Sequence, residues 1–465
     1  MVYNLKTHAK KLLADTLTPV NIYLKLRDVY ACSILLESSD YHGHENSLSY
    51  ICCEPMASFA VNPRGVEIQY PGTKKTIKSS GKVLPLLEEF KNSFQPDPTL
   101  HSRFSINGLF GYTAYDAIPH FEDITLDKKE NPIPEMIYSL YRYVIVVDHF
   151  SNELSLFEHQ LEGTDSPGSS LDEVEQIIFS HRFSTYKFTV TDKETSNFTD
   201  EEYIQMVEKG KEHCFRGDVF QIVLSRRFTC GFKGDDFNVY RALRSVNPSP
   251  YLFYFDYGDF KLMGSSPEAQ LQVNKGKAYI YPIAGTFRRT GNDQEDAALA
   301  KKLAEDEKEN AEHVMLVDLA RNDMSRNADK VAVEVFKEIQ FYSHVIHLVS
   351  KVSGTLRSDA SVVSMAADTF PAGTLSGAPK HMAMTLINRY ENVNRSFYGG
   401  AIGYLGFDHS YNHAIMIRTF LSQGGKLTFQ AGAGVVSKSN AQSELQEVNN
   451  KLGALRRAVE LAEKI

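Results

Sequence analysis

The chain of 465 residues contains no tryptophan, although it has 24 tyrosines and 28 phenylalanines. Its five cysteines are an odd number without a C-x-x-C pair, which argues against a disulfide framework and a zinc site. The net charge is −8 and the sequence has no dense run of basic residues, so nucleic acids and anionic membranes are poor partners. The longest apolar runs, such as 143–147, are far shorter than the roughly 20 residues that span a bilayer. The N-terminus has no hydrophobic signal core, so we expect a cytoplasmic protein.

The composition is that of a globular protein, with 42% hydrophobic and 23% charged residues. At roughly 150 residues per domain, the length suggests about three domains or one large one. Thr199, followed three residues later by Glu202, predicts a capping box that opens a helix over 200–216. We therefore predict two regions, a sheet-rich region at 1–195 and a mixed one at 196–465, with a polar joint at 163–170 in the first.

Two helices in the second region carry acidic residues. Apolar residues at helical spacing predict one helix over 297–320 and another over 441–462. The second has one buried stripe, formed by Leu445, Val448, Leu452, Leu455 and Val459. Between the two helices, 412–421 and 427–435 are expected to form strands of a hairpin.

Carboxylates on these helices lie three residues apart: Glu309 and Glu312 on the first, Glu444 and Glu447 on the second. Residues at this spacing share a helix face, and Glu444 and Glu447 lie at or just beyond the edge of the apolar stripe. A few hard oxygen ligands suit Mg²⁺ better than zinc or Ca²⁺. Spacing alone fits surface glutamate pairs better, since helices carry such pairs everywhere.

Glycine-rich segments occur from residue 370 onward, at 370–380, 398–400 and 431–434. Their backbone N–H groups, with Thr374, Lys380 and Arg418 of an apolar strand, could hold substrate carboxylates. Turns and bulges with an edge-strand arginine fit equally well. His347 interrupts another apolar strand, where a hydrogen-bonded core histidine is commoner than a proton shuttle. From the residues alone, we expect a Mg²⁺-dependent enzyme for a small polyanion, without a named reaction.

The sequence resembles the chorismate-utilising enzymes, most closely component I of the anthranilate synthases. The similarity covers 198–465 almost continuously, through GDVFQIVLSRR at 217–227, SPE at 266–268, YPIAGT at 281–286, EH at 312–313, ARND at 320–323, TLSGAPK at 374–380 and GAG at 432–434. It is looser in the first region, through LLES at 35–38 and GLFGY at 108–112. The resemblance implies an α/β fold of the α+β type, in which two large antiparallel sheets pack together with helices outside.

The resemblance also implies roles for individual residues. Glu312 and Glu447 would hold Mg²⁺, with Glu309 and Glu444 behind them. Glu268 would be the general acid at the C4 hydroxyl, His347 would act in pyruvate elimination, and Thr374 would assist catalysis. Chorismate would be held by Gly285, Thr286, Tyr398, Arg418, Gly432, Ala433 and Gly434.

Two residues indicate the nucleophile and the product. Isochorismate and salicylate synthases carry Lys where this chain has Gln221, and a neutral amide cannot activate water as a base. Aminodeoxychorismate synthase component I often carries Lys in place of Ala284. We therefore expect chorismate and ammonia to give anthranilate and pyruvate, with ammonia from glutamine supplied by a separate glutamine amidotransferase subunit. A non-catalytic amino-acid sensor on the same fold is the remote alternative, because every implied catalytic position holds a competent residue.

A feedback site for L-tryptophan is implied by two further segments. Ser38 and the turn of Pro250, Tyr251 and Leu252 resemble the segments that form the inhibitor pocket in regulated relatives. Leu252 replaces the usual Met, and Ser47 stands where an Arg is common. A strand end packed on a proline turn is the alternative. The absence of tryptophan from the chain fits an enzyme made when tryptophan is scarce.

Overall fold

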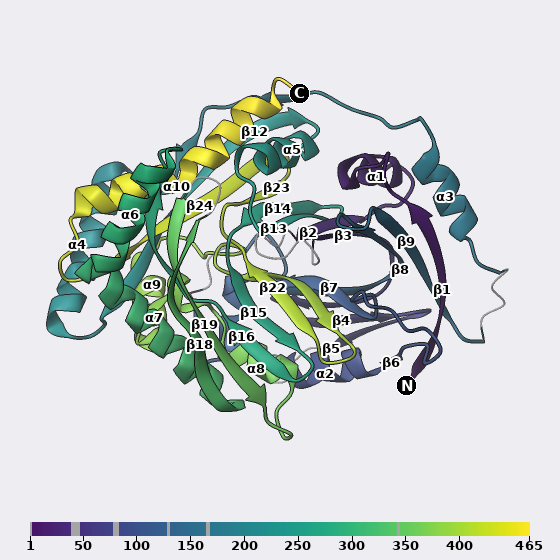
Figure 1. The fold of residues 1–465 in the computed structure, drawn as a ribbon, viewed down its shortest axis with the longest axis horizontal. Coiled ribbons are helices and arrows are strands. Elements are labelled where there is room, and N and C mark those ends of the chain that lie inside the picture. The colour runs from purple at the N-terminus through teal and green to yellow at the C-terminus, as the bar shows by residue number, and fades with distance from the viewer. Residues whose placement is uncertain (1, 39–46, 78–82, 128–130, 164–167, 342–344) are drawn as a thin grey trace.

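The computed structural model describes residues 2–38, 47–77, 83–127, 131–163, 168–341 and 345–465. Among these residues all strand pairs are antiparallel, except the parallel pair of β1 (Tyr3–Leu13) with β6 (Phe94–Gln95). Strand β3 (Leu48–Asn62) is the junction of the fold, because it pairs with strands of both large sheets. The N-terminal strands lie to the right in Figure 1, and several helices of the region 196–465 lie to the left.

The first sheet begins at one edge of β3, where β2 pairs with it. Its order is β2 (Ile34–Ser38), β13 (Tyr251–Asp256), β14 (Phe260–Ser266), β23 (Thr419–Gln423), β24 (Lys426–Val435) and β12 (Gln221–Gly234). The short strands β10 (Phe188–Val190), β11 (Thr195–Ser196) and β20 (Gly377–Ala378) pair with β12. The last strands of this sheet, β24 and β12, carry several of the predicted site residues.

The second sheet extends from the other edge of β3. Its order is β8 (Met136–Asp148), β7 (Gly108–Thr113), β21 (Ala401–Gly406), β22 (Tyr411–Ile415), β15 (Ala269–Asn274), β16 (Lys277–Ile280), β19 (Val345–Leu356) and β18 (Ala328–Phe341). Strand β17 (Ile283–Arg288) also pairs with β19. Strands β9 (Glu153–Leu161) and β1 continue from β8, and β4 (Gly65–Tyr70) and β5 (Thr73–Ile77) continue from β3.

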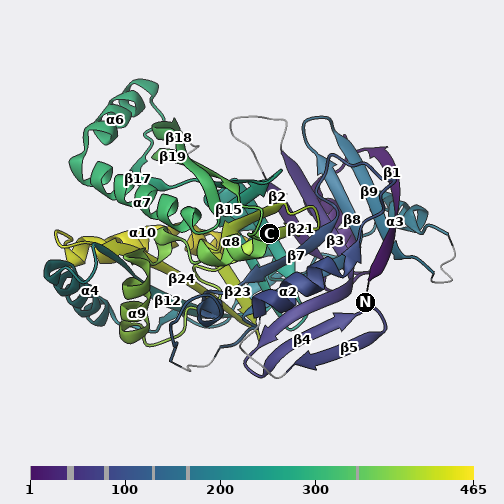
Figure 2. The ribbon, with the colours of Figure 1, turned by 90° about the horizontal axis from the view of Figure 1, so that it is seen from below.

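The two sheets pack against each other, and helices cover their outer faces. Buried aromatic residues of both sheets, such as Phe110, Tyr404, Phe253 and Phe255, form one core cluster. A second cluster joins the first sheet to α1 (Pro19–Leu26), α3 (Leu171–Phe179), α4 (Asp200–Arg216), α5 (Phe237–Val246), α9 (Lys380–Tyr390) and α10 (Ala441–Ala462). A third joins the second sheet to α2 (Val83–Asn92), α7 (Glu307–Ser325) and α8 (Val362–Asp368). These layers confirm the predicted fold class (Figures 1 and 2).

Two helix predictions are confirmed and one is wrong in part. Thr199 and Glu202 form the predicted capping box at the start of α4, and α10 spans the predicted 441–462. The helix predicted over 297–320 is instead two helices, α6 (Asp293–Glu305) and α7. The break falls at Asp306, whose backbone is extended and not helical. Its side-chain oxygen caps α7 by accepting a hydrogen bond from the Glu309 N–H. Figure 2 shows α6 standing away from the rest of the molecule.

The predicted strand over 412–421 is also wrong in part. It is two strands, β22 in the second sheet and β23 in the first, so the chain changes sheets between them. Arg418 lies in this break with a positive φ of 49° and is not a regular strand residue. The turn at Gly424 and Gly425 joins β23 to β24 as the hairpin predicted.

Strands of the predicted regions 1–195 and 196–465 share both sheets. Strand β2 pairs with β13, and β7 pairs with β21. The boundary at residue 195 stays a prediction, and part of the polar joint at 163–170 lies outside the described residues. Within the described part of the chain, no helix combines the length and apolar character needed to cross a bilayer.

Candidate active site

The first group of predicted site residues meets where β12 begins. Gln221, the first residue of β12, donates a hydrogen bond from Nε2 to Oε1 of Glu312 on α7, at 2.8 Å. The side chain of Gln221 is buried, and its Oε1 has no hydrogen-bond partner among the described residues. A Cβ atom at Gly434 would clash with Nε2 of Gln221, so a glycine is needed for the amide to reach Glu312. The structure thus brings together three predicted residues that are far apart in the sequence.

A second group lies on strand β24 and on helix α10, which packs against this strand. Lys451 on α10 donates to the carbonyl oxygen of Gly432 at 2.9 Å and forms an ion pair with Oε1 of Glu447 at 2.7 Å. The hydroxyl of Tyr398 lies 3.1 Å from the position that a Cβ atom on Gly432 would occupy. Glu444, one turn before Glu447, is buried, as expected at the edge of the apolar stripe.

Sequence reasoning missed Lys451. Its signal was its position four residues after Glu447, on the same face of α10. Together, Lys451 and Glu447 connect α10 to the backbone of β24, beside the residues that resemble chorismate-binding positions. Ala433 lies between the two glycines of β24 and is buried opposite Leu224 of β12.

The third group surrounds Glu268, between β14 and β15. The Thr374 hydroxyl, on the short helix η3 (Gly373–Leu375), donates to Oε1 of Glu268 at 3.0 Å. Burial raises the pKa of Glu268 to about 8, against smaller lowering effects of Thr374, Lys451 and Arg418. Glu268 is therefore protonated at neutral pH and can donate a proton. Glu268, Thr374 and Asp323 line one small cavity with residues of α7.

Arg418 lies close enough to Glu268, and His347 close enough to Arg418, for their charges to shift one another's pKa. Burial lowers the pKa of the Arg418 guanidinium, whereas Glu268 raises it when its carboxyl is ionised. Burial also lowers the pKa of His347, so its imidazole is neutral at neutral pH, and the positive charge of Arg418 acts in the same direction. The Nδ1 atom of His347 lies 2.9 Å from the carbonyl oxygen of Gly285. Because that oxygen only accepts hydrogen bonds, the proton of the neutral ring sits on Nδ1.

Gly285 connects His347 to α7. It has a positive φ of 68°, and a Cβ atom there would lie 2.7 Å from Leu303 and 3.2 Å from Oε2 of Glu309. A larger residue would displace these neighbours, so glycine allows β17 to approach the helices closely. The backbone of Thr286 pairs with His347 across β17 and β19, while its side chain lies outside the described atoms.

Two candidate residues of the sequence analysis have structural partners. From the sequence, Lys380 could hold a substrate carboxylate. In the structure Lys380 instead forms a buried ion pair with Asp323 of α7 at 2.6 Å. Nε2 of His313 lies 2.6 Å from Oγ of Ser350 on β19. His313 therefore fixes α7 to the second sheet while Glu312, its neighbour, faces Gln221.

The two carboxylates expected to hold Mg²⁺ approach the same part of β24. Glu312 lies beside Gly434, and Glu447 is bridged to Gly432 by Lys451. No cluster of three or more His, Cys, Asp or Glu residues suited to a metal occurs in the described ranges. A pair of carboxylates still fits Mg²⁺, which usually keeps several waters and takes further oxygens from its substrate. The donor chemistry of the site is thus compatible with the expected metal.

The two segments expected to bind tryptophan are neighbours in the first sheet. Ser38 is paired with Tyr251 across β2 and β13, and Glu37 with Leu252. Pro250 directly precedes β13, and Leu252 is buried. Ser47, at the position where relatives often carry Arg, precedes β3, while 39–46 lie outside the described residues. The register brings the segments together as the resemblance implied, and their role stays a prediction.

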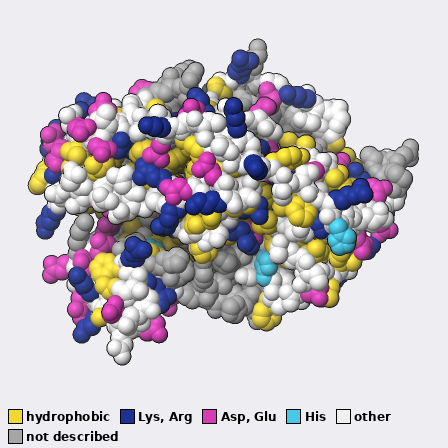
Figure 3. Space-filling model, turned by 90° about the horizontal axis from the view of Figure 1, so that it is seen from above, with side chains coloured by type: hydrophobic (Ala, Val, Ile, Leu, Met, Phe, Trp, Pro, Cys, Tyr) yellow, Lys and Arg dark blue, Asp and Glu magenta, His cyan; other side chains and the backbone are white. Residues whose placement is uncertain are grey.

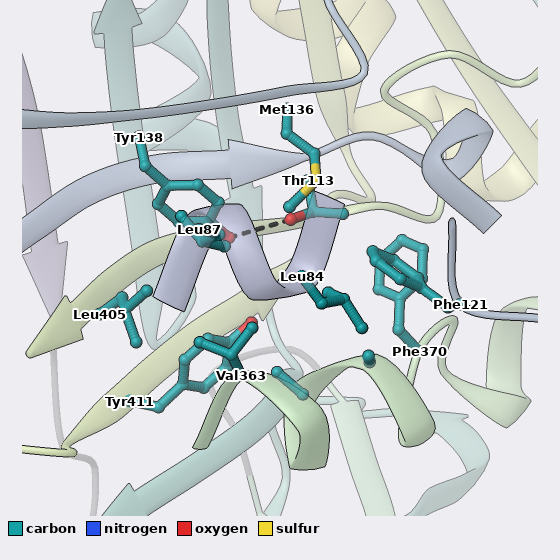
Figure 4. A pocket seen from close by; sticks show the side chains of 12 residues that line it. Leu84, Leu87, Thr113, Phe121, Met136, Tyr138, Val363, Phe370, Leu405 and Tyr411 are labelled. Carbon is teal, nitrogen blue, oxygen red and sulfur yellow. Dashed lines mark hydrogen bonds between the residues drawn. The ribbon is translucent and has the colours of Figure 1, made fainter. Parts of the chain in front are cut away.

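A separate apolar cavity contains none of the predicted site residues. It lies between α2, α8 and the second sheet, and Figure 4 shows Thr113 and Tyr138 hydrogen-bonded at its wall, 2.9 Å apart. Its remaining walls are formed by Leu84, Leu87, Phe121, Met136, Val363, Ala366, Ala367, Phe370, Leu405 and Tyr411. The predicted site instead lies where α7 and α10 meet β12 and β24. Figure 3 shows a hollow in the surface beside the part of the molecule that carries α6.

Known proteins resemble this chain over nearly its whole length. The model of the chorismate binding enzyme family matches residues 35–457. Anthranilate synthase component 1 of Aquifex aeolicus is 38% identical, covering 99% of this chain and 96% of the relative. The protein of the same name from Neisseria gonorrhoeae is 37% identical, again covering 99% and 96%.

Solved structures extend the comparison to the fold. Anthranilate synthase component I from Streptococcus pneumoniae superposes with a TM-score of 0.78 at 30% identity, over 97% of this chain and all of that chain. A menaquinone-specific isochorismate synthase from Escherichia coli shares the fold, with a TM-score of 0.75 at 18% identity over 98% and 95% of the two chains. The match over most of the chain, and the relatives above 35% identity, lead to one conclusion: the chain belongs to the family of chorismate binding enzymes, within its anthranilate synthase component 1 group.

Proposed function

We propose that the protein converts chorismate and ammonia to anthranilate and pyruvate. The observation that carries the proposal is the buried Oε1 of Gln221, which has no hydrogen-bond partner in the described part of the chain while Nε2 is bonded to Glu312. A buried acceptor without a partner is costly, and an incoming ammonia molecule can donate an N–H to it. The amide cannot take a proton from water, so Gln221 supports ammonia as the nucleophile.

Glu268 supplies the acid that the amination needs. Hydroxide is a poor leaving group, so as ammonia forms its bond to C2 and the ring double bonds shift, the protonated carboxyl of Glu268 would donate a proton to the departing C4 hydroxyl of chorismate. Thr374 fixes the orientation of that carboxyl through its hydrogen bond. The positive charge of Arg418, in the field of Glu268, would attract a carboxylate of the substrate.

His347 supplies the base for the elimination step. Because its proton sits on Nδ1, bonded to the Gly285 carbonyl, Nε2 is the basic nitrogen. Nε2 would remove the C2 proton of the aminated ring, the enolpyruvyl C–O bond would break, and pyruvate would leave as the ring becomes aromatic. A neutral imidazole is the form required, and the lowered pKa of His347 favours it.

Glu312 and Glu447 would hold Mg²⁺, with Glu309 and Glu444 behind them on the same helices. When bound, the metal would neutralise and orient a substrate carboxylate. Glu312 also accepts the hydrogen bond of Gln221, so one carboxylate connects the metal site to the nucleophile site. Lys451, next to Glu447, would balance part of the negative charge.

Two other products of the family are less well supported. Aminodeoxychorismate synthases often carry Lys at the position of Ala284, which here is buried in β17 opposite Leu348. Isochorismate and salicylate synthases use water and carry Lys at the position of Gln221. Both residues of this chain therefore favour anthranilate, and the competent residues at the other positions disfavour a non-catalytic sensor.

Partners and regulation are part of the proposal. A separate glutamine amidotransferase subunit would deliver ammonia, and we place both proteins in the cytoplasm. L-Tryptophan would bind between Ser38 and the turn of Pro250, Tyr251 and Leu252. Tyr251 also pairs with Ser266 on β14, two residues before Glu268, so this pocket would be one strand away from the general acid.

The purified chain, given chorismate, Mg²⁺ and an ammonium salt, tests the proposal. We expect fluorescent anthranilate and pyruvate in equal amounts, and no anthranilate when ammonium is left out. A product of 4-amino-4-deoxychorismate or isochorismate, identified by mass and chromatography, would overturn it.

A further inference from the structure

A fully buried ion pair lies directly behind the proposed site. Arg395, in the segment between α9 and β21, donates from Nη2 to Oε1 of Glu391 at 2.6 Å and from Nε to Oε2 at 2.8 Å. The two side chains are 1% and 3% exposed to solvent. Neither residue was singled out by the sequence, and the proposed chemistry does not use them.

The remaining bonds of Arg395 reach two other parts of the site. Nη1 donates to the carbonyl oxygen of Leu375 at 2.6 Å, and Nη2 donates to that of Val223 at 2.7 Å. The guanidinium also lies over the ring of Tyr398, 5.6 Å from its centroid. Glu391 extends the network, because its Oε1 accepts the backbone N–H and the hydroxyl of Ser225 at 2.8 and 2.6 Å.

Each contact holds a neighbour of a proposed catalytic or binding residue. Leu375 follows Thr374, the hydrogen-bond donor to Glu268. Val223 follows Gln221 by two residues and pairs with Gly434. The guanidinium of Arg395 thus contacts both the segment that carries Thr374 and the strand that carries Gln221.

Stability alone does not account for such a pair. Removing two charges from water is costly, and well-packed apolar residues in their place often give equal stability. What apolar residues cannot supply is the planar fork of donors that fixes two carbonyl oxygens and a carboxylate in one geometry.

We propose that Arg395, held by Glu391, is a positioning residue that fixes the Thr374 segment, the start of β12 and the Tyr398 ring relative to one another. The inference rests on the proposed function. It predicts that Arg395 acts on the reaction through Thr374 and Gln221 without touching the substrate.

The test compares Arg395→Lys with Arg27→Lys. Arg27 makes a similar two-bond pair with Asp235, at 3.0 and 2.6 Å, and lies over Phe237, but it joins α1 to the segment before α5. We expect Arg395→Lys to lower kcat about 100-fold, the order of loss that a misplacement of about 1 Å causes. Arg27→Lys should leave kcat unchanged while lowering the melting temperature to a similar extent.

A double-mutant cycle with Thr374→Ala separates positioning from a general loss of structure. If Arg395 acts through Thr374, the fold loss in kcat caused by Arg395→Lys is much smaller when Thr374 is already Ala. The same cycle is run with Gln221→Ala, and a fold loss that is equal to that in wild type in both the Thr374→Ala and the Gln221→Ala backgrounds overturns the proposal. If Arg395→Lys does not fold, Glu391→Gln replaces it in the same cycle and is judged by the same criterion.

Hydrogen exchange on the free protein gives a readout that does not depend on the activity. We expect Arg395→Lys, but not Arg27→Lys, to speed exchange of the backbone amides at 221–225 and 373–378. Unchanged exchange in both segments contradicts the inference even if anthranilate is made. Absence of anthranilate from the wild-type chain, with faster exchange in Arg395→Lys, would refute the proposed function alone.

Discussion

Replacing Glu268 by Gln should remove activity and increase stability above neutral pH. The carboxyl of Glu268 has a pKa of about 8 in the folded protein, against an ordinary value of 4.5, because its half-buried site desolvates the charged form. As the pH rises from about 4.5, the unfolded chain loses this proton first, so the folded state loses stability until about pH 8. Gln does not ionise and escapes this loss, but it cannot deliver the C4 proton.

The magnitude follows from the pKa difference. Each unit is worth about 1.36 kcal/mol, so the full shift corresponds to about 5 kcal/mol. Glu268 remains partly exposed, so we expect roughly half of this amount to be observed. Glu268→Gln should therefore be about 2 kcal/mol more stable than wild type at pH 8, and equally stable at pH 5.

Urea unfolding of both proteins at pH 5 and pH 8 measures the difference. Glu158→Gln is the control of opposite sign. Burial alone would raise the pKa of Glu158, but hydrogen bonds from Gln160, Arg142 and Ser170 lower it to about 2. Its stabilising contribution is present above about pH 4.5 and lost toward pH 2, so Glu158→Gln should lose about 3 kcal/mol at pH 8. The same stability difference between wild type and Glu268→Gln at both pH values would refute the reasoning.

Three further predictions concern the metal, the elimination and the feedback site. Glu447→Gln should abolish turnover while leaving the melting temperature nearly unchanged, because the amide keeps the volume but not the charge that holds Mg²⁺; near-normal turnover at low Mg²⁺ would show the assignment to be wrong. His347→Met should release the aminated, non-aromatic intermediate in place of anthranilate, as chromatography with mass detection can establish, whereas neither compound would mean a structural role. Millimolar tryptophan should inhibit the wild type, and Ser38→Phe should relieve the inhibition; full wild-type activity without binding heat by calorimetry would exclude the site.

Local patterns predicted the elements whose signals are local. In the apolar stripe of α10, Leu445, Val448, Leu452 and Leu455 are buried and Val459 is partly buried. The capping box of Thr199 and Glu202 depends on two residues only three positions apart. The break at Asp306 was missed because apolar residues continue at helical spacing on both sides of it. Arg418 was placed on a strand because the change of sheets between β22 and β23 depends on pairing partners far away in the sequence.

The site was predicted less by spacing than by resemblance. Spacing showed that Glu309 and Glu312 share a face, but not that Glu312 meets Gln221, which lies 91 positions earlier in the chain. Lys451 had only its place four residues after Glu447 as a signal. Arg395 had none, because its function depends on carbonyl groups of Val223 and Leu375, which any residue type supplies.

The identity of the nucleophile tests the central claim most directly. Wild type and Gln221→Lys would each be given chorismate, Mg²⁺ and ¹⁵N-ammonium in H₂¹⁸O, and the products analysed by mass spectrometry. Because the Gln221 amide cannot act as a base toward water, whereas a lysine amine can, we expect ¹⁵N-anthranilate from the wild type and a product with an ¹⁸O-hydroxyl group from Gln221→Lys. A wild-type product that carries ¹⁸O in its ring hydroxyl and no ¹⁵N would contradict the account.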